Sequence, residues 1–68
     1  MNKIEVVSDN VILNDVKDSI TTYSDNGILI INCKKDSEVL LINNVYKEIV
    51  IEVSNDVVLN ILEIKNDS

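Results

Sequence analysis

Short aliphatic runs alternate with short polar clusters along the whole chain. The clusters are rich in Ser, Asp and Asn, which favour turns, and the runs consist almost entirely of Ile, Val and Leu, which favour strands. This alternation is typical of β-strands joined by short turns, so the chain is expected to be all-β. It predicts seven strands, at residues 3–7, 11–14, 19–23, 28–33, 38–42, 48–53 and 57–64.

Within the predicted strands, the spacing of apolar residues indicates which faces are buried. Ile49, Ile51 and Val53 recur at every second position, as a strand with one buried face requires. Residues 28–31 and 39–42 are instead apolar on both faces, which indicates strands covered on both sides or a surface that awaits a partner. In residues 57–64 the alternation changes phase, which predicts a bend or bulge near Ile61 and Leu62.

An internal repeat in the sequence indicates how these strands are arranged. Residues 8–18 return in similar form at 37–48, roughly 29 residues later, and the order of turn and aliphatic run in 23–32 returns in 53–60. Self-similarity at a fixed period usually means that one unit stacks on its own copy. The repeat therefore favours a short β-solenoid or β-helix, with inward ladders that include Leu41, Ile51 and Leu59.

One turn favours a different architecture. Asn26-Gly27, between two apolar segments, is a strong signal for a two-residue hairpin, which belongs to a small antiparallel β-sandwich or meander. We favour the solenoid because the hairpin signal explains one turn, whereas the repeat explains most of them. In either case residues 1–68 are expected to form a single all-β domain, on its own or as a fragment of a longer β-helix.

The length and residue content limit how this domain is stabilised. At 68 residues a single core is barely sufficient, and small domains often add disulfides or a structural metal. The chain has one cysteine and no histidine, so an intrachain disulfide and a histidine-containing zinc site are excluded. Dense aliphatic packing or a protein partner is therefore expected to supply the stability.

The charge pattern excludes several classes of partner. The formal net charge is −6 and every cation is a lysine, so phosphate neutralisation on nucleic acid is not expected. The longest purely aliphatic run, residues 28–31, is too short to span a bilayer, and no signal peptide is expected at the start, which favours a cytoplasmic protein. Asn66-Asp67-Ser68 is a glycosylation sequon that would matter only after secretion.

Candidate chemical groups are few. Cys33 precedes two lysines, whose charge would lower its pKa if it were exposed, but a buried, small hydrophobic role is favoured. Glu48, Glu52 and Glu63 are expected to face solvent, and the Asp and Asn clusters are expected to form turns rather than calcium loops. No catalytic, cofactor-binding or metal-binding residue is assigned, no cofactor is expected, and the protein is not expected to be an enzyme.

The segment from Lys47 to Ile64 combines an aliphatic strand, a short acidic turn, a Val-Leu pair and a following Leu-Glu. In this it resembles the opening of the β-helical core in the SufB/SufD family of iron–sulfur cluster assembly scaffolds. The resemblance implies a stacked scaffold, either an N-terminal piece or a short relative, that pairs with a second β-helical subunit and an ABC-type ATPase. No segment matches the family's cluster-holding or ATPase-docking parts, so the resemblance gives Cys33 no cluster role.

Three functions follow as expectations. The first is a non-catalytic scaffold or assembly protein similar to SufD-like components. The second is a structural β-solenoid that associates with itself through its open sheet edges. The third is a small protein-binding β module that uses the apolar face of residues 28–31 or 39–42. All three predict protein–protein interaction and a homo- or hetero-oligomer.

Overall fold

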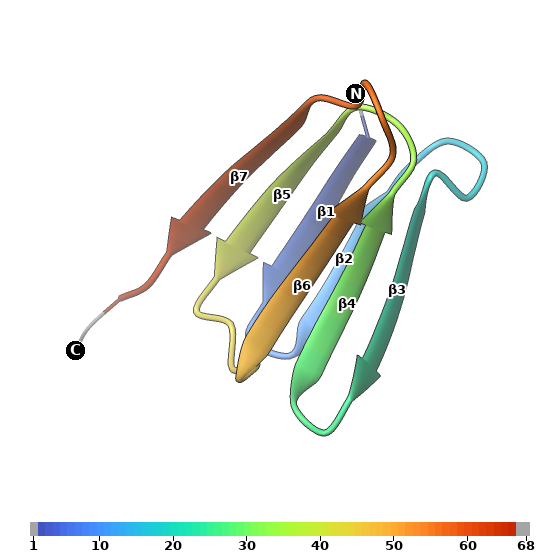
Figure 1. Cartoon of the computed structure of the whole chain (residues 1–68). Coiled ribbons are helices and arrows are strands. Elements are labelled where there is room, and N and C mark those ends of the chain that lie inside the picture. Colours follow the sequence, from blue (N-terminus) through green and yellow to red (C-terminus); the bar gives the residue numbers. More distant parts are fainter. Residues whose placement is uncertain (1, 67–68) are drawn as a thin grey trace.

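A computed structural model describes residues 2–66 and contains seven strands and no helix in that range (Figure 1). All seven predicted strands are present, with ends within two residues of the prediction, so the all-β prediction is confirmed. The strands are β1 (Asn2–Val7), β2 (Asn10–Asn14), β3 (Ile20–Asp25), β4 (Ile28–Cys33), β5 (Ser37–Ile42), β6 (Glu48–Val53) and β7 (Leu59–Ile64).

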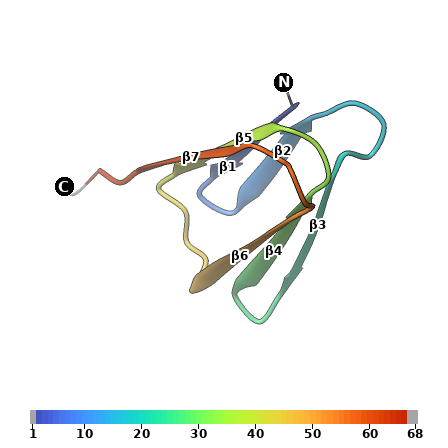
Figure 2. The same ribbon diagram turned by 45° about the horizontal axis from the view of Figure 1, so that its top comes forward.

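The strands form two facing sheets, which Figure 2 shows as separate layers. One sheet has the order β2-β1-β5-β7 and the other has the order β3-β4-β6. Antiparallel hairpins join β1 to β2 and β3 to β4, whereas β1–β5, β5–β7 and β4–β6 are parallel pairs. From β4 onward each successive strand lies in the other sheet, so the chain passes back and forth between the layers.

The turn between β3 and β4 has the backbone that its sequence predicts. Asn26 and Gly27 have φ values of 52° and 80°, and two consecutive positive φ angles are the requirement of a type I′ hairpin turn. Asp25 and Ile28 are the last pair of the antiparallel ladder, so the loop consists of Asn26 and Gly27 alone. The prediction of a hairpin at Asn26-Gly27 is therefore confirmed.

The roughly 29-residue repeat, in contrast, is not the spacing of the stacked strands. Ser37 lies opposite Asn2 on one side and Leu59 on the other, offsets of 35 and 22 residues. Ile28 lies opposite Glu48, an offset of 20 residues. The predicted period of about 29 residues was wrong because the segment after Ser8 folds back along β1 as an antiparallel hairpin.

Two finer predictions also need correction. Strand β7 pairs with β5 without interruption from Leu59 to Ile64, so the expected bulge is not present. Leu41 lies opposite Glu63, whereas Leu59 lies opposite Ser37 and Ile51 belongs to the other sheet, so these three apolar residues do not form one ladder. The change of phase instead reflects a charged residue, Glu63, at a position that neighbouring strands fill with apolar residues.

The core lies between the two sheets and is built from four of the strands. Alternate residues of β1, β4 and β5 face inward, and the antiparallel hairpin adds one residue of β3. No helix in residues 2–66 is long and apolar enough to cross a membrane. The buried apolar residues are Ile4, Val6, Ile20, Leu29, Ile31, Cys33, Val39 and Leu41.

Candidate functional site

Strands β6 and β7 form one flank of the molecule, and each pairs with only one neighbour. We call these two strands and the side chains between them the open flank; β2 and β3 form the opposite, hairpin flank (Figure 1). A strand that pairs on one side leaves a row of backbone N–H and C=O groups without a ladder partner, and such an edge can template another strand. The open flank therefore offers two such edges, one from each sheet.

The side chains of the open flank are aliphatic where they face the core. Ile49 and Ile51 pack against the buried cluster from β6, and Leu59 does so from β7, but all three are only partly buried. Ile61, opposite the buried Val39, is 54% exposed because no further strand covers it. The core thus reaches the surface at this flank, which gives the flank an apolar region that can contact another protein.

A shallow hollow of about 340 Å³ lies on the open flank between the two sheets. Its apolar lining comes from Leu41, Ile49, Ile51 and Ile61. Polar and charged side chains also line it: Asn44, Tyr46, Lys47, Glu48, Glu63 and Lys65. The exposed lining is more polar than apolar, so the hollow offers both hydrogen-bonding groups and an aliphatic contact surface.

Glu63 is the unusual member of this lining. It lies opposite Leu41, which in turn lies opposite Val6, and both of those residues are buried. The Glu63 carboxylate accepts a hydrogen bond of 3.0 Å from the side-chain amide of Asn44. The Lys65 ammonium lies 3.9 Å from the same carboxylate oxygen, and both side chains are about half exposed. The Glu63 side chain is exposed, as predicted. It does not lie on the outer face of the sheet, however, because its position belongs to the row that faces the core.

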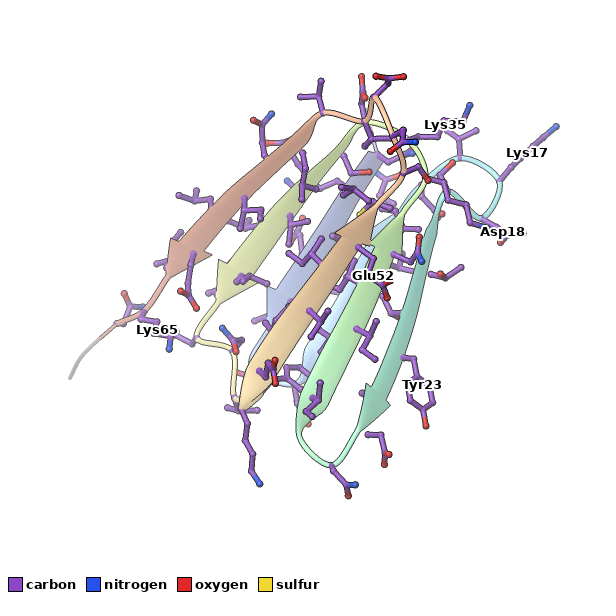
Figure 3. All side chains as sticks on the ribbon, in the orientation of Figure 1. Lys17, Asp18, Tyr23, Lys35, Glu52 and Lys65 are labelled. Atoms are coloured by element: carbon purple, nitrogen blue, oxygen red, sulfur yellow. The ribbon has the colours of Figure 1, made fainter. Side chains whose placement is uncertain are left out.

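A second, larger hollow of about 690 Å³ lies at the end of the molecule where β1 begins. Lys17, Lys34 and Lys35 line it, and Figure 3 shows Lys17 and Lys35 at this end and Lys65 at the other. Two of its other polar side chains already hold the surrounding loops. Asn2 Oδ1 accepts a hydrogen bond from Val16 N, and Asp36 Oδ1 accepts one from Val58 N. These groups explain the loop structure without a ligand.

Cys33 ends β4 and is fully buried, in agreement with the favoured interpretation of a small core residue. Burial raises the pKa of its thiol, and a hydrogen bond with the Ser37 side chain opposes that shift in part. The lysines that follow it in sequence do not activate it. In residues 2–66 no group of three or more His, Cys, Asp or Glu side chains is placed to hold a metal ion. Of the sequon, Asp67 and Ser68 lie outside the described residues.

The sequence predicted a binding face on residues 28–31 or 39–42 and did not single out the outer strands. Residues 28–31 and 39–42 belong to β4 and β5, which are flanked on both sides, and alternate residues of each run are buried in the core. The exposed apolar residues lie instead on the outer strands, where Leu62 is 58% exposed. The one sequence signal for this site was the phase change in residues 57–64, because an edge strand can carry apolar residues on both faces together with an inward charge.

Comparison of the chain with models of known protein families, with curated proteins and with solved structures gave no match.

Proposed function

We propose that the protein is a non-catalytic interaction module, a short β-solenoid that binds a partner protein by strand addition at its open flank. The observation that carries this proposal is the aliphatic inward row of β6 and β7, which packs on the core on one side and has no covering strand on the other. In strand addition, main-chain hydrogen bonds supply affinity and alternate side chains supply specificity. The two free edges and the hollow between them suit this mode of binding.

The solenoid part of the proposal is supported by the second half of the chain. Strands β4 to β7 alternate between the sheets and stack in parallel, as successive coils of a solenoid do. Two corners support the same interpretation. Ser8 and Asn43 follow equivalent ends of β1 and β5, and both have positive φ angles, 56° and 48°. The Ser8 amide also donates to the Ile42 carbonyl, which continues the ladder into the corner.

The proposal can be tested by site-specific photo-crosslinking in the source cell. A photoreactive phenylalanine analogue would replace Leu62 on the open flank or, as the matched control, Tyr23 on the hairpin flank, which points outward from β3 (Figure 3). We expect an adduct of one defined mass from position 62 and none from position 23. Equal adducts at both positions, or none at position 62, would contradict binding at the open flank.

A second candidate is the scaffold role of the SufB/SufD family. It is favoured by the segment that carries the resemblance, Lys47 to Ile64, which forms β6, a turn and β7, stacked in parallel on the preceding strands. This candidate predicts that the adduct contains a second β-helical subunit and that an ABC-type ATPase co-purifies with it. We propose the cytoplasm as the location, because the thiol of Cys33 suits a reducing compartment.

A further inference from the structure

The position of Glu63 restricts what can pair with β7. In the row that runs from Val6 through Leu41 to Glu63, the first two side chains are buried and apolar. A strand added to the free edge of β7 would place its own side chain next in this row and would remove water from the Glu63 carboxylate. Burying a charged group without a partner is unfavourable, so the added strand must supply a compensating group.

The present partners of Glu63 do not supply that compensation. Asn44 donates one hydrogen bond from an uncharged amide, and the Lys65 ammonium is 3.9 Å away on a side chain that is itself largely exposed. An exposed ion pair of this kind contributes little to stability. Once the carboxylate is covered by a strand, a cation held directly opposite it would form a shorter and stronger charge-assisted hydrogen bond.

A second copy of this chain does not meet the requirement in the two registers that pair the most residues of β7. Two identical edges related by a two-fold axis pair antiparallel, so a β7–β7 pair centred on Ile61 places Glu63 opposite Leu59 of the other copy. A pair centred on Leu62 places Glu63 opposite Ile61 of the other copy. In both registers the carboxylate faces an aliphatic side chain, and each copy brings a net charge of −6. The free edge is thus poorly matched to itself.

We infer that Glu63 selects the partner: the strand that pairs with β7 belongs to a different protein and carries a lysine or arginine beside Glu63, with aliphatic residues facing Leu59 and Ile61. This inference rests on the proposed function, because it specifies the occupant of the open flank. The apolar part of the hollow, formed by Leu41 and its neighbours, receives the aliphatic side chains. The inward carboxylate then acts both as a specificity contact and as a barrier to self-pairing.

A tethered test strand can examine this selection directly. A short strand of alternating threonine and valine is joined to the C-terminus of the full chain by a flexible Gly/Ser linker, which gives it a high effective concentration. Its central inward residue is Lys, Leu or Glu. The unfolding equilibrium and the hydrogen exchange of β7 amides are measured for each version. We expect the Lys strand to be more stabilising than the Glu strand by about two- to fivefold in the unfolding constant.

Two charge-reversed backgrounds complete the test. Glu63→Lys should reverse the order of the Lys and Glu strands, whereas Asp25→Lys, with the same change of net charge on the hairpin flank, should leave it unchanged. Equal effects of the three strands, with β7 amides protected, would overturn the role of Glu63 but retain strand addition. Failure of every strand to protect β7 would overturn both proposals. A wild-type dimer with protected β7 amides would make a second copy the occupant.

Discussion

The two flanks of the β3-β4-β6 sheet differ in the side chains that they turn toward the core. Opposite Ile31 and Leu29 of the central strand β4, the hairpin flank places Thr22 and Ser24. Opposite the same two residues, the open flank places aliphatic side chains, Ile51 and Ile49. A small hydroxyl side chain is well solvated at an edge, whereas isoleucine at the same depth leaves apolar surface exposed unless something covers it.

The two flanks thus differ in the strands and side chains that they place at the free edges of the sheets. The hairpin flank ends each sheet with an antiparallel strand, and on β3 most exposed residues are polar. The open flank ends with parallel strands, which continue the alternation between sheets, and it has a charge in its inward row, Glu63. In the β3-β4-β6 sheet one edge is polar and the other is aliphatic, whereas in the other sheet both edges expose aliphatic side chains, among them Leu13 on β2 and Ile61 on β7.

The strongest test removes the same side chain from the centre and the edge of one row. Ile31 is fully buried on β4, whereas Ile51, opposite it on β6, is only partly buried. Ile31→Ala should lower the free energy of unfolding by about 2–5 kcal/mol, and Ile51→Ala by roughly 1–2 kcal/mol, because the edge site creates less cavity. Denaturant unfolding of the two variants measures the difference. Equal losses would show that β6 is covered in the isolated protein.

The strands could be predicted from sequence because turn residues and β-branched runs act locally. Asn26-Gly27 specified its hairpin for the same reason, since few residues other than glycine tolerate φ near 80°. The stacking could not be predicted, because β5 pairs with β1 across 35 residues and their sequences share only an alternation. The open flank was missed because burial depends on a strand's neighbours. Runs in β4 and β7 look equally apolar, yet only β4 lies between two strands.

Cys33 and Val53 allow a second test within one row. They lie opposite each other, but Cys33 is buried and Val53 is substantially exposed. A thiol reagent should modify Cys33 only through unfolding, whereas Val53→Cys in a Cys33→Ala background should react at least about a hundredfold faster. Comparable rates at both positions would mean that β4 opens as readily as β6, and the contrast between centre and edge would be lost.

The raised pKa of Cys33 adds a pH dependence to this comparison. Because burial favours the protonated thiol, its contribution to stability is complete below the unfolded pKa, near 8.5, and is lost as the pH rises toward the folded pKa. The free energy of unfolding should therefore fall in the wild type as the pH rises above the unfolded pKa. Cys33→Ala should remove this part of the slope. A slope that persists unchanged in the variant would assign it to other groups.

A third test removes the charge that distinguishes the edge of β7. Glu63→Leu would continue the apolar row formed by Val6 and Leu41 and enlarge the uncovered aliphatic surface. We expect the variant to associate with itself more strongly than the wild type, by roughly tenfold, as burial of one added leucine side chain allows. Light scattering across a concentration series measures this. Glu38→Leu on the paired strand β5 is the control, and an equal increase there would reflect general hydrophobicity.

The smallest expected change in the free energy of unfolding concerns two stacked corners, Ser8 on the hairpin side and Asn43 on the open side. Both residues have positive φ angles, which cost a non-glycine residue free energy, and asparagine tolerates them better than serine. Ser8→Gly should therefore raise the free energy of unfolding by about 0.5 kcal/mol. Asn43→Gly should give no gain, because the Asn43 side-chain oxygen accepts a 2.8 Å hydrogen bond from the Asn66 amide, and glycine cannot replace it. Thermal unfolding of the two variants distinguishes the corners. A larger gain from Asn43→Gly than from Ser8→Gly would show that the bond to Asn66 does not hold the chain after β7.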